Sequence, residues 1–136
     1  MDLDAARDFI RANSRSVLCT MRKDGSPQLS PVNCAVDPQG RVVISSRETA
    51  YKVQHLRRDR RAWLLVLRDA FYGDWVQVEG EVEITSLPEA MEPLVEYYRA
   101  VAGEHPDWEE YRAAMRSERR CLIRLDPTKA GPDRSG

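Results

Sequence analysis

The sequence predicts a mainly β fold: a small, mostly antiparallel barrel of six or so strands with helices added at its edges. About six segments have the alternating or β-rich composition of strands, and no helix separates most neighbouring strands, which excludes a doubly wound parallel sheet. The 136 residues are enough for one domain, and at this size folding removes about two-thirds of the unfolded chain's surface from water. We therefore expect a single barrel domain over residues 1–125 and a flexible C-terminal tail over 126–136.

The beginning of the chain is predicted to form one helix and three antiparallel strands. Apolar side chains recur at helical spacing at Leu3, Ala6 and Ile10, so a short helix should end near Asn13. An Asp-Gly pair at 24–25 favours a tight hairpin turn. Pro31 has no amide hydrogen to give to a ladder, so its strand should lie at an edge or contain a bulge. The three strands are expected over 16–22, 27–36 and 41–46.

The middle of the chain is predicted to form a short helix and two strands. The helix lies within 47–59, where apolar residues stand three apart, and Thr49 is its expected N-cap. The apolar segment 62–67 should be a strand covered on both faces. The segment 75–84 alternates so strictly between apolar and polar residues that it should be a strand with one buried face and one wet or interfacial face.

Two more helices and a strand are expected in the last third. The segment 86–89 has the Ser-x-x-Glu pattern of a capping box, and the helix after it should end at Gly103. Asp107 should cap another helix, which carries Trp108, Tyr111 and Met115. A final strand is expected over 119–125.

Composition excludes several classes of protein. The net charge is −1, with 21 basic and 22 acidic residues, which argues against a surface that tracks nucleic acid along its whole length. The longest apolar run, Ala62 to Leu67, is too short to cross a bilayer. The N-terminus opens with acidic residues and lacks the pattern of a secretory signal, so we expect a cytoplasmic protein.

The cysteines and histidines do not suggest a metal site. Three cysteines are widely spaced in strand-like segments and are expected to be small buried core residues: Cys19, Cys34 and Cys121. His55 and His105 are far apart in the sequence, and neither has a Cys/His cluster beside it. We therefore expect neither a disulfide framework nor a bound metal.

The segment 45–52 carries the most chemical information, because a hydroxyl-rich strand end runs into a helix there. The N-terminus of a helix offers unpaired amide donors and a partial positive charge, which favour a phosphate. Arg47 and Lys52 add full charges, while Ser45, Ser46 and Thr49 add neutral donors. The alternative interpretation is that Ser46 or Thr49 only caps the helix and that the two cations are solvated.

Aromatic side chains at strand ends could stack on a planar ligand, although such residues often serve packing. Tyr51, Tyr72 and Trp75 are the candidates, and Trp75 is preferred because it lies off the core face of its strand. No Ser-His-Asp order, catalytic acid pair or reactive cysteine is evident, so no catalytic residue is predicted. The alternating Glu79, Glu81 and Glu83 are interpreted as a solvated or interface face.

Several short motifs, in this order, resemble the pyridoxamine 5'-phosphate oxidase-like split β-barrel proteins. They are Asp24-Gly25, Pro31-Val32, Thr49-Ala50-Tyr51-Lys52, Leu56-Arg57-Arg58-Asp59-Arg60-Arg61-Ala62 and Val78-Glu79-Gly80-Glu81-Val82. The segment from Tyr98 to Trp108 is similar to the actinobacterial branch that uses the deazaflavin coenzyme F420. The resemblance covers roughly residues 5 to 125.

The resemblance implies a homodimer with a cofactor groove on each side of the subunit interface. Lys52 matches a lysine that contacts the cofactor phosphate, the strand end before it lines the same pocket, and 30–33 lies beside the ring system. The sequence departs from the common pattern at Ala50, Gln54 and His55. The expected cofactor-binding residues are Val32, Asn33, Ser45, Ser46, Arg47, Thr49, Ala50, Tyr51, Lys52 and Trp75.

These observations lead to the prediction of an F420-binding oxidoreductase that transfers a hydride between the reduced deazaflavin and a small organic acceptor. One alternative is an FMN-dependent enzyme on the same barrel, and another is a non-catalytic flavin or deazaflavin carrier. A nucleic-acid-binding module is a third, because basic residues concentrate over 47–61. That segment lacks the interleaved exposed aromatic residues of a base-stacking surface, so nucleic acid is not the expected partner.

Overall fold

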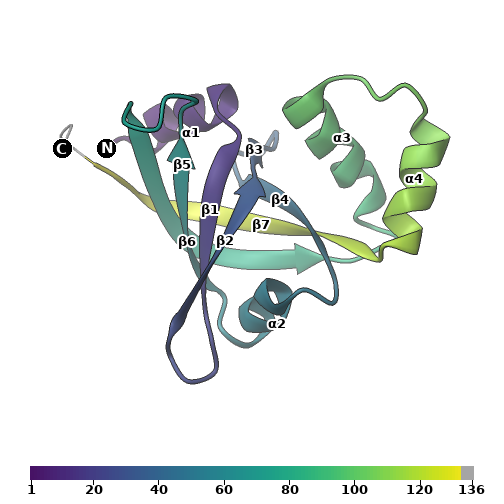
Figure 1. Ribbon diagram of the computed structural model, residues 1–136, viewed down its shortest axis with the longest axis horizontal. Helices are drawn as coiled ribbons and strands as arrows, with labels where there is room; N and C mark the ends of the chain where they lie inside the picture. The colour runs from purple at the N-terminus through teal and green to yellow at the C-terminus, as the bar shows by residue number, and fades with distance from the viewer. Residues whose placement is uncertain (133–136) are drawn as a thin grey trace.

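The computed structural model describes residues 1–132, which form a curled, seven-stranded antiparallel sheet and four helices (Figure 1). The strand order is β2-β1-β5-β6-β7-β4-β3. The strands are β1 (Arg15–Met21), β2 (Pro27–Asn33), β3 (Ala35–Val36), β4 (Val42–Arg47), β5 (Arg61–Leu67), β6 (Trp75–Thr85) and β7 (Arg120–Gly131). The helices are α1 (Leu3–Ala12), α2 (Tyr51–Arg58), α3 (Met91–Ala102) and α4 (Trp108–Ser117). This mainly β architecture is the half-open barrel with added helices that the sequence predicts.

The main hydrophobic core fills the inside of the curled sheet. Every second residue of β5 and β6 points into it, so the alternation that predicted β6 is confirmed by the burial of Val76, Val78 and Val82. Helices α1 and α2 lie at opposite ends of the barrel, as Figure 1 shows, and they add Ile10, Val53 and Leu56 to this core.

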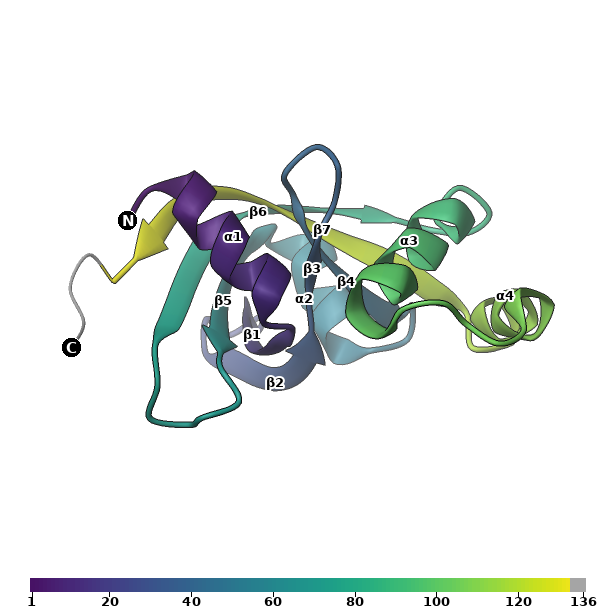
Figure 2. The same cartoon turned by 90° about the horizontal axis from the view of Figure 1, so that it is seen from above.

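A second core lies on the outer face of β3, β4 and β7, where α3 and α4 pack. Val43 and Leu122 belong to it, whereas their neighbours Ile44 and Ile123 belong to the barrel core. The helix pair stands to one side of the barrel in Figures 1 and 2. These strands are therefore covered on both faces, and adjacent residues of one strand serve different cores.

The predicted strand 27–36 forms two separate strands in the structure. The strand divides at Cys34, where β2 ends and β3 leaves to pair with β4. The amide of Cys34 donates to the carbonyl of Ser14 (2.9 Å) instead of continuing a ladder. β2 pairs only with β1, so Pro31 lies in an edge strand as predicted.

The last strand is longer than predicted. β7 continues beyond Leu125 to Gly131 and pairs with β6, so residues 126–131 belong to the sheet and not to the expected tail. Backbone pairing does not require apolar side chains, and Pro127 lies at the register shift beside Gly80, where a missing amide interrupts the ladder least. Residues 133–136 of the expected tail lie outside the described residues.

Two of the predicted helix starts are wrong. α2 begins at Tyr51, and its N-cap is Ala50 without a side-chain hydrogen bond, so Thr49 does not cap it. α3 begins at Met91 with Ala90 as its N-cap, and Ser86 forms no capping box, since its Oγ donates to Glu48 Oε1 (2.5 Å). By contrast, Asp107 accepts from the amide of Glu110 (3.1 Å) and caps α4 as predicted.

The position at which α3 ends and the burial of two cysteines agree with the predictions from the sequence. Gly103 ends the helix with a φ of 83°, a conformation that favours glycine. Cys34 and Cys121 are buried, but Cys19 is only half-buried, so its predicted core position is wrong. None of the helices in residues 1–132 combines the length and the apolar character that a membrane crossing would need.

We expect Gly80→Ala to destabilise the fold. The added Cβ would collide with the backbone carbonyl of Asp126 on β7, and the two strands cannot separate there without losing ladder hydrogen bonds. The expected loss is about 1–3 kcal/mol in the free energy of unfolding, measured by urea denaturation. Gly131→Ala is the matched control, because its Cβ would meet no atom within 4 Å. Equal stabilities of the two variants would contradict the close approach at Gly80.

Candidate functional site

A groove of about 500 Å³ opens between the strand ends and the helix pair α3–α4. Its walls come from five parts of the chain: the end of β2, the outer face of β4, the first turn of α2, the helix pair with its connecting loop, and the start of β7. Segments far apart in the sequence therefore meet at one site. The lining residues used below are Val32, Asn33, Ser45, Lys52, Tyr97, Tyr98, His105, Tyr111, Glu118 and Arg120.

The two-residue period of β4 and β7 decides which of their side chains reach this groove. Ser45 shares the outer face of β4 with Val43 and lines the groove, whereas Ser46 shares the inner face with Ile44 and is 2% exposed. On β7, Arg120 lies on the same outer face as Leu122 and also lines the groove. One of the two predicted serines is thus placed at the site and the other in the barrel.

Lys52 is a half-buried cation without a partner. It projects from the first turn of α2 into the groove and makes no hydrogen bond or ion pair with any residue of 1–132. Burial lowers the pKa of its ammonium below the ordinary value, and the positive charge of Arg120 lowers this pKa further. An uncompensated, partly desolvated positive charge at the wall of a groove favours an anionic ligand.

The other cations of the segment 47–61 are already engaged. Three arginines form ion pairs: Arg57 with Glu48 (2.6 Å), Arg60 with Glu81 (3.9 Å) and Arg61 with Asp59 (2.7 Å). Arg58 donates to the carbonyl of Met21 (2.6 Å), and Arg47 lies 3.5 Å from Glu118. Of the six cations in this segment, Lys52 alone has no contact of this kind within the described chain.

Glu118 holds two arginines at the open side of the groove. Its Oε1 accepts from Nε and Nη2 of Arg120 (3.0 and 2.8 Å), and the guanidinium of Arg47 lies 3.5 Å away. The hydrogen bonds from Arg120 are the main reason that the pKa of this carboxyl is lowered. Arg120 is therefore fixed in position, while the charge of Lys52 remains uncompensated.

Aromatic side chains of α3 and α4 form the opposite wall. The hydroxyl of Tyr97 donates to the carbonyl of Asn33 (3.0 Å), and that of Tyr111 donates to the carbonyl of Leu94 (2.7 Å). Burial raises the pKa of Tyr111 to about 12, so this phenol stays neutral at physiological pH. The rings of Tyr98 and His105 lie 5.0 Å apart, and Trp108 packs against both.

The tautomer of neutral His105 follows from its backbone contact. Its Nδ1 lies 2.9 Å from the amide nitrogen of Asp107 and accepts that hydrogen. The neutral ring therefore carries its own proton on Nε2, which makes this nitrogen the hydrogen-bond donor of the ring.

The family model described as pyridoxamine 5'-phosphate oxidase matches residues 3–131, almost the whole chain. The chain belongs to the pyridoxamine 5'-phosphate oxidase family. The resemblance inferred from the short motifs is therefore confirmed at the level of the family.

Solved structures of the same fold include proteins with different names. A conserved hypothetical protein from Mycobacterium tuberculosis is 27% identical, with 96% of this chain and 82% of that chain covered and a TM-score of 0.76. An F420 reductase is 20% identical, with 92% and 94% covered and a TM-score of 0.71. A heme-binding protein from Mycobacterium smegmatis is 19% identical, with 97% and 55% covered and a TM-score of 0.69. The last two likenesses show the shared fold.

The remaining predicted site residues of this family member lie outside the groove. Thr49 and Tyr51 are exposed, and Tyr51 stacks on His55 with 6.5 Å between ring centroids. Ala50 caps α2, and Arg47 reaches only the carboxylate of Glu118 at the groove's edge. Of the ten predicted residues, Val32, Asn33, Ser45 and Lys52 line the groove.

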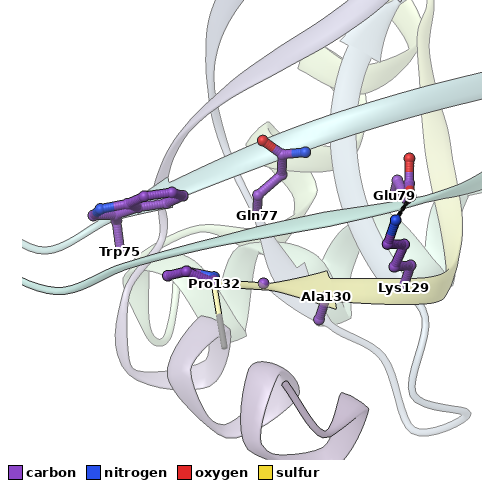
Figure 3. Close-up of a pocket in the computed structure, with 7 residues that line it drawn as sticks. Trp75, Gln77, Glu79, Lys129, Ala130 and Pro132 are labelled. Atoms are coloured by element: carbon purple, nitrogen blue, oxygen red, sulfur yellow. Dashed lines mark ion pairs between the residues drawn. The ribbon is translucent and has the colours of Figure 1, made fainter. Parts of the chain in front are cut away.

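Trp75 lies in a separate shallow hollow of about 300 Å³ on the outer side of β6 and β7 (Figure 3). Gln77 and Glu79 project from the same face of β6, and Glu79 forms an ion pair with Lys129 (3.7 Å). The structure therefore separates Trp75 from Lys52 within one chain.

The helix-pair wall is the part of the groove that sequence reasoning missed. The sequence predicts Tyr111 only as a residue of the helix that Asp107 caps, and it assigns no site role to Tyr98 or His105, although both lie in the segment that resembles the F420-using branch. Arg120 and Glu118 had no local motif at all. Two signals pointed to this region, the density of aromatic residues in 97–111 and the resemblance of 98–108 to the F420-using branch, but neither reports that both helices face the end of β2. Within residues 1–132, no group of three or more His, Cys, Asp or Glu side chains is arranged to hold a metal ion.

Proposed function

We propose that the protein is an F420-dependent oxidoreductase, which transfers a hydride between the reduced deazaflavin and a small organic acceptor. The observation that carries the proposal is the unpartnered, half-buried Lys52 at one wall of a groove whose other wall is aromatic. A ligand with a phosphate at one end and a planar ring at the other complements both walls. The name of the structurally similar F420 reductase supports the choice of deazaflavin.

The residues of the phosphate wall suit an anion. Lys52 offers an ammonium, Arg120 a guanidinium held by Glu118, and Ser45 a hydroxyl. Charge-assisted hydrogen bonds of this kind are about twice as strong as neutral ones. In this proposal Lys52 neutralises the phosphate, and Ser45 and Arg120 orient it.

The residues of the aromatic wall suit a planar ring. Tyr97, Tyr98 and His105 offer ring faces and edges, and Val32 offers an apolar contact from the end of β2. When bound, the deazaflavin would supply a hydride at one carbon of its ring. The chain's own task is then to position ring and acceptor and to limit access of water. His105 Nε2–H is the side-chain donor we assign to the acceptor, because Nδ1 is already used by Asp107.

The proposal includes a homodimer with a small molecule bound beside the subunit interface. Large apolar side chains that one chain leaves exposed support it, and Leu29, Phe71 and Tyr72 are 66%, 73% and 97% exposed. Phe71 and Tyr72 lie in the loop between β5 and β6, and Trp75 is the first residue of β6 after that loop. In the proposed dimer, Trp75 lines a groove to which the partner contributes Lys52.

Direct titration tests the proposed cofactor against its alternatives. We expect purified apoprotein to bind F420 more tightly than FMN, measured by quenching of the fluorescence of each cofactor. Haem, measured by its absorbance, is the third probe because a similar structure belongs to a heme-binding protein. FMN binding that equals or exceeds F420 binding would favour the flavin enzyme or carrier, and haem binding alone would reject both.

Lys52→Ala should weaken cofactor binding by about one to two decades. The change removes one charge-assisted contact of about 1.5–3 kcal/mol while Ser45 and Arg120 remain. Stability of the apoprotein should not fall, because Lys52 has no partner in the described chain and its pKa is lowered by burial. Dissociation constants from the fluorescence titration, together with thermal midpoints, measure both effects.

Arg57→Ala is the matched control for this variant. It removes a positive charge from the same helix, but Arg57 pairs with Glu48 and does not line the groove. Cofactor affinity should therefore stay within about twofold of the unaltered protein. Equal losses in both variants would show that overall charge, and not a contact at Lys52, governs binding.

Cofactor affinity should fall as the pH rises through the lowered pKa of Lys52. The protonated ammonium binds the phosphate, and because burial lowers its pKa, the proton is lost below the ordinary lysine value of 10.5. Titrations from pH 7 upward should show the decline in the unaltered protein and a weaker one in Lys52→Ala. Identical pH profiles for the two proteins would assign the decline to another group.

A further inference from the structure

A second hollow, which we call the hairpin cavity, lies on the other side of Tyr97 from the groove. Its volume is about 710 Å³, and it is bounded by the end of α1, the β3–β4 hairpin and α3. Figure 2 shows the hairpin rising between α1 and α3. The cavity is larger than the groove and shares only Tyr97 with it.

The walls of the hairpin cavity are mainly apolar. The floor is the outer face of the sheet and the side is α3, and the apolar part of the lining includes Ala35, Val36, Val43, Leu122, Pro93 and Ala100. A volume of this size lies within the range of small-molecule pockets, which are lined in the same way. The shape and lining thus suit an aliphatic body.

One polar group that lines this cavity, the guanidinium of Arg124, is only partly hydrogen-bonded. Arg124 lines the cavity and donates from Nη1 to Thr85 Oγ1 (2.9 Å), but its buried Nε–H has no partner. Its guanidinium forms no ion pair with any carboxylate of residues 1–132. Glu83 stands directly opposite in the β6–β7 register, yet its carboxylate makes no ion pair with Arg124.

The other charged groups around the cavity are already paired. Asp37 binds Arg41 (2.9 Å), Glu96 binds Arg99 (2.7 Å), and Glu92 binds Arg112 (2.5 Å). Arg11, at the rim, binds Asp8 (2.8 Å). Arg124 is therefore the charge in the cavity that still needs a partner of opposite sign.

We propose that the hairpin cavity binds a small aliphatic monocarboxylate, whose carboxylate pairs with Arg124 and whose hydrocarbon body lies against the apolar wall. The planar guanidinium offers several N–H donors in the geometry that a carboxylate matches. Burial of the Nε–H without a partner is costly, and a carboxylate oxygen would remove that cost. The site is independent of the proposed cofactor.

Octanoate and 1-octanol are the probes, because they share a chain length and differ in charge. Isothermal titration calorimetry of the full-length protein should show octanoate binding at least about tenfold more tightly than 1-octanol. Arg124→Gln should weaken octanoate binding by about ten- to a hundredfold and leave 1-octanol unchanged. Arg116→Gln, at an exposed arginine on α4 outside the cavity, is the charge control and should bind octanoate normally.

Two further variants locate the site without removing Arg124. Ala100→Trp adds bulk at an exposed helix position that lines the cavity, so it should abolish binding of both probes. Lys52→Ala should leave octanoate binding unchanged, which separates this cavity from the groove. Equal affinity for octanoate and 1-octanol, binding that survives Ala100→Trp, or loss of octanoate binding in Lys52→Ala would overturn the proposal.

Discussion

The antiparallel pairing of β4 with β7 is the constraint on which both candidate sites depend. The two strands pair from Val42 opposite Leu125 to Arg47 opposite Arg120, and side chains alternate between the two faces. The inner face completes the barrel core, and the outer face carries the helix pair. A shift of β4 by one residue would send Ser45 into the barrel and bring Ser46 to the groove, and the same shift of β7 would exchange Arg120 for Cys121. Burial on both faces therefore holds the site in register.

Ion pairing distinguishes two cations, Lys52 and Arg124, from most of the other basic residues. Most arginines have a carboxylate nearby, including Arg47, Arg57, Arg60 and Arg61 of the strongly basic segment 47–61, so the concentration of positive charge in the sequence is largely compensated in the fold. Exposed ion pairs of this kind contribute little to stability. An arginine that is already paired with a carboxylate is, however, less available to bind an anionic ligand. Lys52 and Arg124 are the cations that line a hollow and have no carboxylate partner in the described chain.

Local patterns in the sequence predicted most of the sheet, because strand alternation reports burial directly. The face of β6 and the cap at Asp107 were predictable in this way. The extension of β7 to Gly131 was not, since backbone pairing with β6 leaves little trace in side-chain pattern. Nor was the N-cap of α2, where Ala50 stands in the capping position without any side-chain acceptor.

The candidate site was predictable on its strand side only. Ser45 and Lys52 are close in sequence, so a single motif contains both. Tyr97, His105 and Arg120 come from a helix, a loop and a distant strand, and their convergence depends on how α3 and α4 pack on the outer face of the sheet. That packing is set by Tyr111, Leu94 and Leu122 in a core whose partners no local pattern specifies.

Tyr97 links the two hollows physically. Its ring contributes to the wall of the groove and to that of the hairpin cavity, and its hydroxyl donates to the carbonyl of Asn33 at the end of β2. Burial raises the pKa of this phenol, so it remains a neutral donor rather than a phenolate that would repel the carbonyl. The hydrogen bond ties α3 to the edge strand, and because α3 borders both hollows, its position sets the width of each. The Tyr97 hydrogen bond thus adds to the core packing that holds α3 between the charged, aromatic groove and the hairpin cavity.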